Sequence, residues 1–112
     1  MLIPDTPPQA SEVKSACQLN MAAVHVKRGE CKEAVACCDK VLKSNGQSVK
    51  ALFRRAQARA GEGDYDLAEQ DLRQALLIDP ESREVAAEMK RVKQAARVLN
   101  EKQKSMFAKM FV

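Results

Sequence analysis

Two cations in the middle of the sequence are spaced for binding a carboxylate. Lys50 and Arg54 lie four residues apart in the stretch 50–58, which is rich in alanine and contains no Gly or Pro. Such a stretch favours a helix, on which residues four apart lie one turn above the other on a single face. An arginine can bind a carboxylate through two parallel hydrogen bonds, and a lysine adds a point charge. The spacing therefore predicts a docking site for an acidic partner, and two solvated surface charges are the competing interpretation.

Metal binding and catalysis find no support in the remaining polar residues. The sequence has one histidine, His25, and its four cysteines form no C-x-x-C pair. A zinc site needs four ligands at suitable spacing, so we expect no metal and no cofactor. No pair or triad suggests a nucleophile with its base, so we expect no catalytic activity. We interpret the cysteines as reduced, small apolar packing residues: Cys17, Cys31, Cys37 and Cys38.

The composition favours closely packed helices. In 112 residues there is no Trp, aromatic residues make up 4%, and Gly and Pro number four each. So few aromatic and turn residues indicate one all-α domain whose core is built from Ala, Leu, Val, Met and Cys. Neither a secretory signal nor an apolar run of membrane-spanning length is visible. We therefore expect no membrane contact and a location in the cytoplasm, or also in the nucleus.

Apolar spacing and turn residues predict five helices. The first is expected over 7–28, capped by Thr6, with an amphipathic pattern formed by Val13, Cys17, Met21 and Val24. Residues 1–6 before it are expected to be loose. The next two are expected over 31–44 and 48–60. A fourth, capped by Asp64, ends at Asp79–Pro80, and a fifth begins at Glu81 or Ser82 and runs almost to the C-terminus.

The chain repeats itself at an interval of thirty-four residues. Shifting the sequence by that interval aligns Leu19 with Phe53, Ala22 with Ala56, Gly29 with Gly63, Ala34 with Ala68, and Gly46 with Pro80. Large residues meet large ones, small meet small, and turn residues meet turn residues. A thirty-four-residue unit of two helices is the signature of the tetratricopeptide repeat. One unit cannot bury its own apolar face, so units stack into a right-handed superhelix with a concave inner surface.

This repeat predicts the organisation of the domain and of its site. We expect two full repeats, 15–48 and 49–82, within 7–82, followed by a capping helix over 83–112 whose Val85, Met89 and Val92 cover the last repeat. Asn20 and Arg54 are one repeat apart, so they occupy the same place on neighbouring helices. Asn20 adds an amide to the two cations. The predicted carboxylate-binding site is therefore Asn20, Lys50 and Arg54.

Three runs together resemble the C-terminal repeat region of the large immunophilins. They are Cys-Gln-Leu-Asn at 17–20, Lys-Ala-Leu-Phe-Arg-Arg at 50–55 and Ala-Lys-Met-Phe at 108–111. These immunophilins are FKBP-type and cyclophilin-type peptidyl-prolyl isomerases with three tetratricopeptide repeats. The resemblance, over roughly 13–111, implies a co-chaperone module that binds the acidic C-terminal tail of heat-shock protein 90. In its two-carboxylate clamp, Asn20, Lys50 and Arg54 would take three of the places.

The resemblance also implies parts that this sequence does not show. The family clamp takes a Lys and an Asn from a further first repeat, and the fourteen residues before Ser15 are too few for one. We therefore expect the chain to start near the second repeat of the family, with an exposed N-terminal repeat face that drives self-association. The isomerase domain would lie upstream. An alternative function is thus the non-catalytic part of a peptidyl-prolyl isomerase.

The positive charge of the chain belongs to its C-terminal part. Up to Pro80 eleven Lys and Arg match eleven Asp and Glu, whereas eight stand against four from Glu81 onward. A basic amphipathic helix with Met and Phe anchors is typical of a calmodulin target, which the resemblance also implies here; an apolar side buried in the core is the competing interpretation. No nucleic-acid motif is visible, so we expect no such partner. The calmodulin candidates are Lys102, Lys104, Met106, Phe107, Met110 and Phe111.

Overall fold

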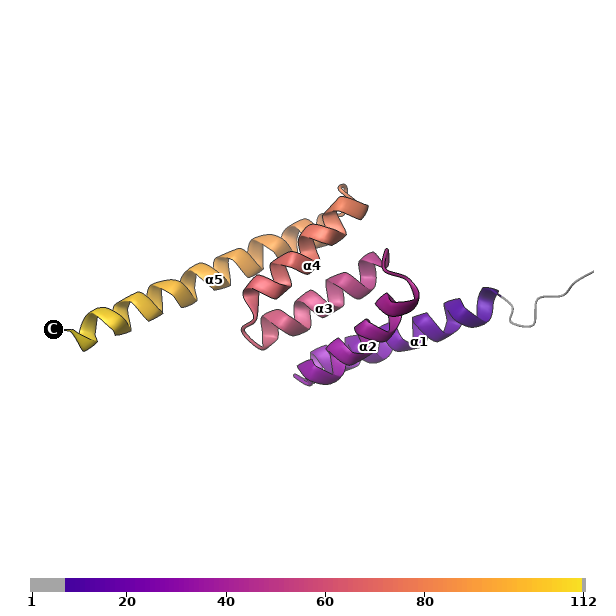
Figure 1. The fold of residues 1–112 in the computed structure, drawn as a ribbon, viewed down its shortest axis with the longest axis horizontal. Helices are drawn as coiled ribbons and strands as arrows, with labels where there is room; N and C mark the ends of the chain where they lie inside the picture. The colour runs from indigo at the N-terminus through magenta and orange to yellow at the C-terminus, as the bar shows by residue number, and fades with distance from the viewer. Residues whose placement is uncertain (1–7, 112) are drawn as a thin grey trace, which may run out of the picture.

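The computed structural model describes residues 8–111, and over that range the chain forms five helices and no strand. Consecutive helices run in opposite directions, and each packs on the next (Figure 1). The all-α fold predicted from the sequence is confirmed. In chain order the helices are α1 (Pro8–Lys27), α2 (Cys31–Ser44), α3 (Val49–Gly61), α4 (Tyr65–Ile78) and α5 (Arg83–Met110).

Serine caps explain where two of the helices begin. The Ser48 hydroxyl accepts a hydrogen bond from the Ala51 N–H at 3.3 Å, and Ser82 does the same for Val85 at 3.4 Å. The capping serines lie just outside the helices, so α3 and α5 begin one residue after them. The predicted cap of α4 is wrong in its mechanism, because Asp64 occupies the cap position without a side-chain hydrogen bond. The predicted cap at Thr6 and the loose segment 1–6 lie outside the described residues.

The sequence repeat is a repeat of backbone geometry as well. Gly29 and Gly63, thirty-four residues apart, have φ of +75° and +85°, a conformation that glycine adopts without steric cost. Their N–H groups donate to the carbonyls of Val26 at 3.1 Å and Ala60 at 3.0 Å, which are also thirty-four residues apart. The turn inside each helix pair is therefore the same turn used twice.

The core is built from small residues at equivalent places of the two repeats. Ala22 and Ala56 are fully buried, and so are Ala34 and Ala68. Side chains without bulk let the helix axes approach closely, and Leu52 and Leu72 fill the space between them. The first half of α5 closes this core, as predicted, through its buried residues Val85, Met89 and Val92.

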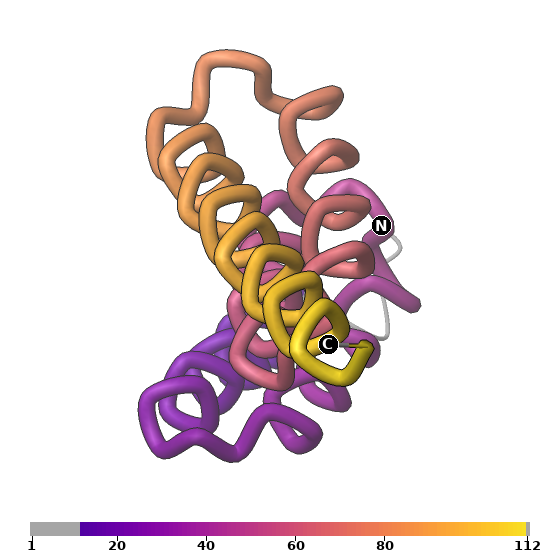
Figure 2. The backbone as a smooth tube through the Cα atoms, turned by 90° about the vertical axis from the view of Figure 1, so that its left-hand side faces the viewer, coloured from indigo at the N-terminus to yellow at the C-terminus, as the bar shows by residue number. Residues whose placement is uncertain are grey.

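Two apolar surfaces stay outside the core. The pattern predicted for the first helix lies on its exposed side, where Val13, Met21 and Val24 are 60%, 49% and 51% exposed. The side of α1 that packs on α2 is the one that carries Ala22. Beyond Ala96 every described residue of α5 is exposed, and this half of the helix projects from the bundle (Figure 1). Figure 2, a view along the long axis, shows its end in front of the bundle.

Candidate functional site

The helices α1, α3 and α5 form the inner side of the array. α3 contacts both α1 and α5, whereas α2 and α4 do not contact each other. An array whose alternate helices touch on one side only curves toward that side. The surface formed by α1, α3 and α5 is therefore the concave one, and we call it the inner surface.

The thirty-four-residue repeat places three polar residues at the same position on these neighbouring helices. They are Asn20 on α1, Arg54 on α3 and Glu88 on α5. Lys50 lies one turn before Arg54 on α3, and Gln57 lies about one turn after it. Asn20 and Lys50 are exposed, and Arg54 is half-buried. The three residues predicted to bind a carboxylate thus lie on adjacent helices of one surface.

Two other arginines of α3 form ion pairs with acidic residues of neighbouring helices. Arg55 donates from Nη2 to Asp71 Oδ1 at 2.6 Å and from Nη1 to Asp39 Oδ1 at 2.8 Å. Arg59 Nη1 donates to Asp71 Oδ2 at 2.8 Å. The hydrogen bonds from Arg55 to Asp71 raise the pKa of the Arg55 guanidinium above its ordinary value. These arginines hold α3 between α2 and α4, and their charge is neutralised within the protein.

Lys50 and Arg54 differ from them in having no such partner. Within the part of the chain that the structure describes, neither forms an ion pair or a side-chain hydrogen bond. The Arg54 Nε is moreover buried and has no acceptor. A covered donor without an acceptor is costly, and Arg54 differs in this from Arg55 and Arg59, whose guanidinium groups have acceptors. That Lys50 and Arg54 bind a carboxylate, rather than being solvated surface charges, stays a prediction.

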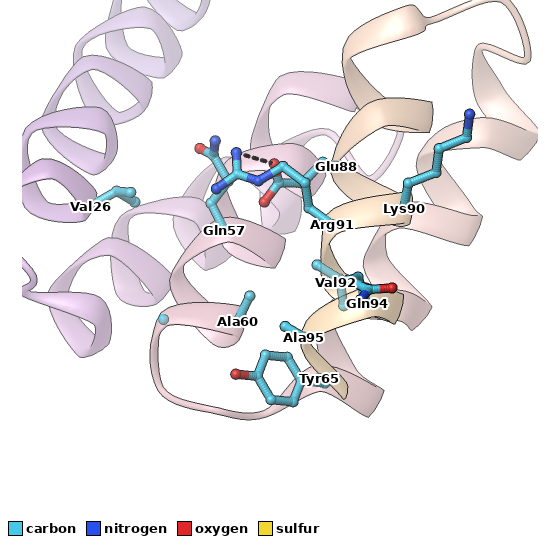
Figure 3. Close-up of a pocket in the computed structure, with 11 residues that line it drawn as sticks. Val26, Gln57, Ala60, Tyr65, Glu88, Lys90, Arg91, Val92, Gln94 and Ala95 are labelled. Carbon is cyan, nitrogen blue, oxygen red and sulfur yellow. Dashed lines mark hydrogen bonds and ion pairs between the residues drawn. The ribbon is translucent and has the colours of Figure 1, made fainter. Parts of the chain in front are cut away.

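A hollow of about 780 Å³ opens on the inner surface beside this site. Val26 of α1, Gln57 and Ala60 of α3, Tyr65 of α4, and Arg91 of α5 line it from four helices (Figure 3). Gln57 belongs to the stripe of α3 that carries Lys50 and Arg54. The hollow therefore extends the predicted site along the inner surface, toward α5.

Glu88 and Arg91 form the polar wall of this hollow. Arg91 Nη1 lies 3.2 Å from Glu88 Oε2, and the two side chains are 77% and 9% exposed, respectively (Figure 3). Sequence analysis did not identify them as site residues. The available signal was the repeat itself, because Glu88 and Arg91 follow Arg54 and Gln57 by thirty-four residues.

The C-terminal candidate residues lie apart from the inner surface. Four of the six are exposed apolar side chains, between 62% and 76% accessible: Met106, Phe107, Met110 and Phe111. The rings of Phe107 and Phe111 pack on each other, with centroids 4.8 Å apart. Lys102 and Lys104 are exposed beside them. The interpretation that the apolar side of this helix is buried in the core is therefore correct for the first half of α5 and wrong for the second half.

The rest of the described chain adds two findings. Over residues 8–111, no three side chains of His, Cys, Asp or Glu gather as metal ligands would. In the same range, none of the helices has the length and apolar character that crossing a bilayer requires.

Comparison with known proteins identifies the repeat and its relatives. Residues 49–82 match the family model of the tetratricopeptide repeat. The peptidyl-prolyl cis-trans isomerase FKBP42 of Arabidopsis thaliana is 35% identical over 102 residues, which are 91% of this chain and 28% of the relative. FKBP4 of Bos taurus is 32% identical over 92% of this chain and 22% of its own length. The chain thus spans about a quarter of these relatives, and the cyclophilin-type alternative gains no support from them.

Solved structures give the same fold. The myosin chaperone UNC-45 from C. elegans, in complex with an Hsp90 peptide, has a TM-score of 0.71 and 30% identity, over 82% of this chain and 10% of that one. The second TPR domain of human RPAP3, in complex with the HSP70 peptide SGPTIEEVD, has a TM-score of 0.67 and 28% identity, over 70% of this chain and 66% of that one. The chain therefore has the tetratricopeptide-repeat fold, and its sequence is homologous to the repeat region of FKBP-type immunophilins.

Proposed function

We propose that this chain is a protein-interaction module whose inner surface binds the acidic C-terminal tail of heat-shock protein 90. Asn20, Lys50 and Arg54 are the residues that receive the carboxylates. The observation that carries the proposal is that some cations of α3 have ion-pair partners within the protein and others do not. Arg55 and Arg59 are neutralised by acidic residues, whereas Lys50 and Arg54 have no described partner and Arg54 Nε is buried.

The chemistry of the three residues suits the end of a peptide. The guanidinium of Arg54 can donate hydrogen bonds to both oxygens of one carboxylate, and the ammonium of Lys50, one turn away, attracts a second carboxylate. Asn20 on the adjacent helix can donate its amide N–H to a carboxylate or a peptide carbonyl. A similar fold that binds an Hsp90 peptide, in UNC-45, supports a chaperone tail as the partner.

Titration calorimetry of the full chain with a peptide of the heat-shock protein 90 tail tests the proposal. We expect saturable binding that weakens as salt is raised, because the site acts through exposed charges. Amidating the C-terminus of the peptide should weaken binding by about 10-fold or more, since a charge-assisted hydrogen bond contributes roughly 1.5–3 kcal/mol. The HSP70 peptide SGPTIEEVD serves as the competing ligand, and tighter binding of that peptide would change the identity of the partner.

Variants of α3 connect this binding to the named residues. Lys50→Ala combined with Arg54→Ala should reduce the affinity by about 100-fold or more, since two charged contacts are lost. Lys43→Ala is the matched control, because Lys43 is an exposed lysine on α2, outside the inner surface. Unchanged affinity of the double variant would refute this site.

The second half of α5 supports a second candidate function, calmodulin binding. Phe107 and Phe111 are largely exposed on a projecting helix that also carries Lys102 and Lys104. Apolar anchors on a basic helix are what the hydrophobic groove of calmodulin accommodates. We further propose that the chain is the non-catalytic part of a longer peptidyl-prolyl isomerase, for which the similarity to FKBP42 is the support.

A further inference from the structure

We infer that Glu88 of α5 makes the inner surface discriminate against an acidic residue in the part of the peptide that precedes its acidic end. The inference rests on the proposed function, because it requires the end of the peptide to lie at Asn20, Lys50 and Arg54. The inference goes beyond that function, because it concerns the peptide residues that precede those bound at Asn20, Lys50 and Arg54.

The position of Glu88 places it in the path of such a peptide. Glu88 occupies on α5 the place that Arg54 occupies on α3, and these two helices are in contact. Packed helix axes lie roughly 8–10 Å apart. An extended chain advances about 3.3–3.6 Å per residue. When the first residue of the acidic end lies at Arg54, the chain that precedes it therefore reaches the hollow beside Glu88 about two to three residues away.

The burial of Glu88 determines what the hollow tolerates. Its side chain is 9% exposed, and its described ion pair is with Arg91 at 3.2 Å. A peptide carboxylate entering the hollow would either lie next to Glu88, with like charge, or draw Arg91 away from it. The second event leaves a buried carboxylate without its counter-ion, which is strongly unfavourable. Both arrangements penalise an acidic residue at this place.

An uncharged side chain meets no such penalty. Apolar surface from Val26, Ala60, Val92 and Ala95 faces the hollow, together with the amide of Gln57. The ion pair of Glu88 and Arg91 can then stay intact while apolar area is removed from water. The inner surface is thus divided: α3 attracts carboxylates, and α5 rejects them.

Peptide variants can measure this division. The probe is SGPTIEEVD, in which the proline, the threonine and the isoleucine that precede EEVD are replaced one at a time by glutamate. We expect one of these replacements to weaken binding to the wild-type chain at least 5-fold. Glu88→Gln keeps the size of the side chain and an oxygen that can accept a hydrogen bond from Arg91. In this variant the loss of affinity caused by the glutamate replacement should shrink to less than 2-fold. Glu101→Gln removes the same charge from the exposed half of α5 and should behave as the wild type.

Arg91→Gln provides an independent test, because Arg91 is exposed and its replacement leaves the fold undisturbed more readily than a change at Glu88. Without its counter-ion Glu88 should reject the acidic peptide more strongly, so the loss should exceed that of the wild type. Equal binding of the parent and all glutamate peptides to the wild type overturns the inference, as does a loss that persists in Glu88→Gln. If SGPTIEEVD does not bind but the tail of heat-shock protein 90 does, the same glutamate replacements before EEVD are tested in that tail. If neither peptide binds, the proposed function fails as well, and the two failures are thereby distinguished.

Discussion

Arg55 of α3 donates two hydrogen bonds to Asp71 of α4, from Nε at 3.0 Å and from Nη2 at 2.6 Å. The Asp71 side chain is 3% exposed, and Arg59 donates to it as well, at 2.8 Å. Arg55 also reaches Asp39 of α2. This cluster crosses three helices on the side of α3 that faces away from the inner surface, so it sets the position from which Lys50 and Arg54 are presented.

Removal of the Asp71 carboxylate should therefore lower stability markedly. Asp71→Asn leaves Arg55 and Arg59 part-buried without their shared counter-ion, and breaking a buried ion pair in this way costs about 3–5 kcal/mol. Urea denaturation followed by circular dichroism measures the loss. Asp66→Asn, at an exposed position in the first turn of the same helix, is the control and should lower the free energy of unfolding by less than about 1 kcal/mol, the contribution of a carboxylate to the helix dipole. A stability of Asp71→Asn equal to that of the control would show that the cluster does not hold α3.

The thiol of Cys38 should make the protein less stable at high pH. Burial raises the pKa of Cys38 from 9.0 to about 12, with the neighbouring Cys37 as a smaller cause. Between those values the unfolded chain loses the thiol proton and the folded chain keeps it, so unfolding becomes easier as the pH rises above 9. Denaturation at pH 8 and at pH 10.5 should show a smaller decrease for Cys38→Ala than for the wild type. The same decrease in both proteins would exclude this thiol as a contributor.

Calmodulin binding predicts a dependence on calcium and on two aromatic rings. The full chain should bind calmodulin in calcium and release it in chelator. Phe107→Ala combined with Phe111→Ala should abolish the interaction, because these exposed rings are the anchors. Val98→Ala is the control, since Val98 is 42% exposed on a different side of the same helix. Binding that is insensitive to calcium would rule the candidate out.

Self-association through α1 can be measured by sedimentation over a range of concentrations. Val13, Met21 and Val24 expose apolar surface along one side of the helix, and we predict that a second copy covers it. Met21→Glu places a charge in this surface and should shift the protein to the monomer. Leu77→Glu is the matched control, because Leu77 is an isolated apolar residue of α4 with 83% exposure. A wild-type chain that is monomeric at every concentration contradicts the prediction.

Catalysis can be tested directly with a proline-isomerisation assay on a short peptide. We predict a rate equal to that of the uncatalysed reaction, because no pair or triad in the sequence suggests a nucleophile with its base. Turnover above the background would place an unrecognised active site in this chain.

Helix positions were accessible from the sequence because they depend on local signals. Cys31–Ser44 was predicted with its observed bounds, since turn residues flank it on both sides. The thirty-four-residue interval then brought Asn20 and Arg54 to one surface, since a repeat of sequence became a repeat of geometry. Such inferences need only neighbours along the chain and one periodicity.

Packing partners were less accessible. Helix α1 has apolar residues on opposite sides, so spacing could not decide whether Ala22 or Met21 faces the core. The pairing of Arg55 with Asp71 joins residues sixteen apart on two helices, and only the arrangement of those helices selects it from the many possible charge pairs. Glu88 was not predicted as a site residue, because its charge is opposite to that of Arg54, which lies one repeat earlier.

The uninterrupted course of α5 has a mechanical consequence. Its first half is fixed to the core, and its last fourteen residues, 97–110, continue as the same rigid rod for about 21 Å at 1.5 Å per residue. A molecule held at the tip of this rod would be kept at a set distance and angle from whatever occupies the inner surface. The protein would thus act as a ruler between two ligands, and fluorescent probes on them would report one narrow separation rather than a broad distribution.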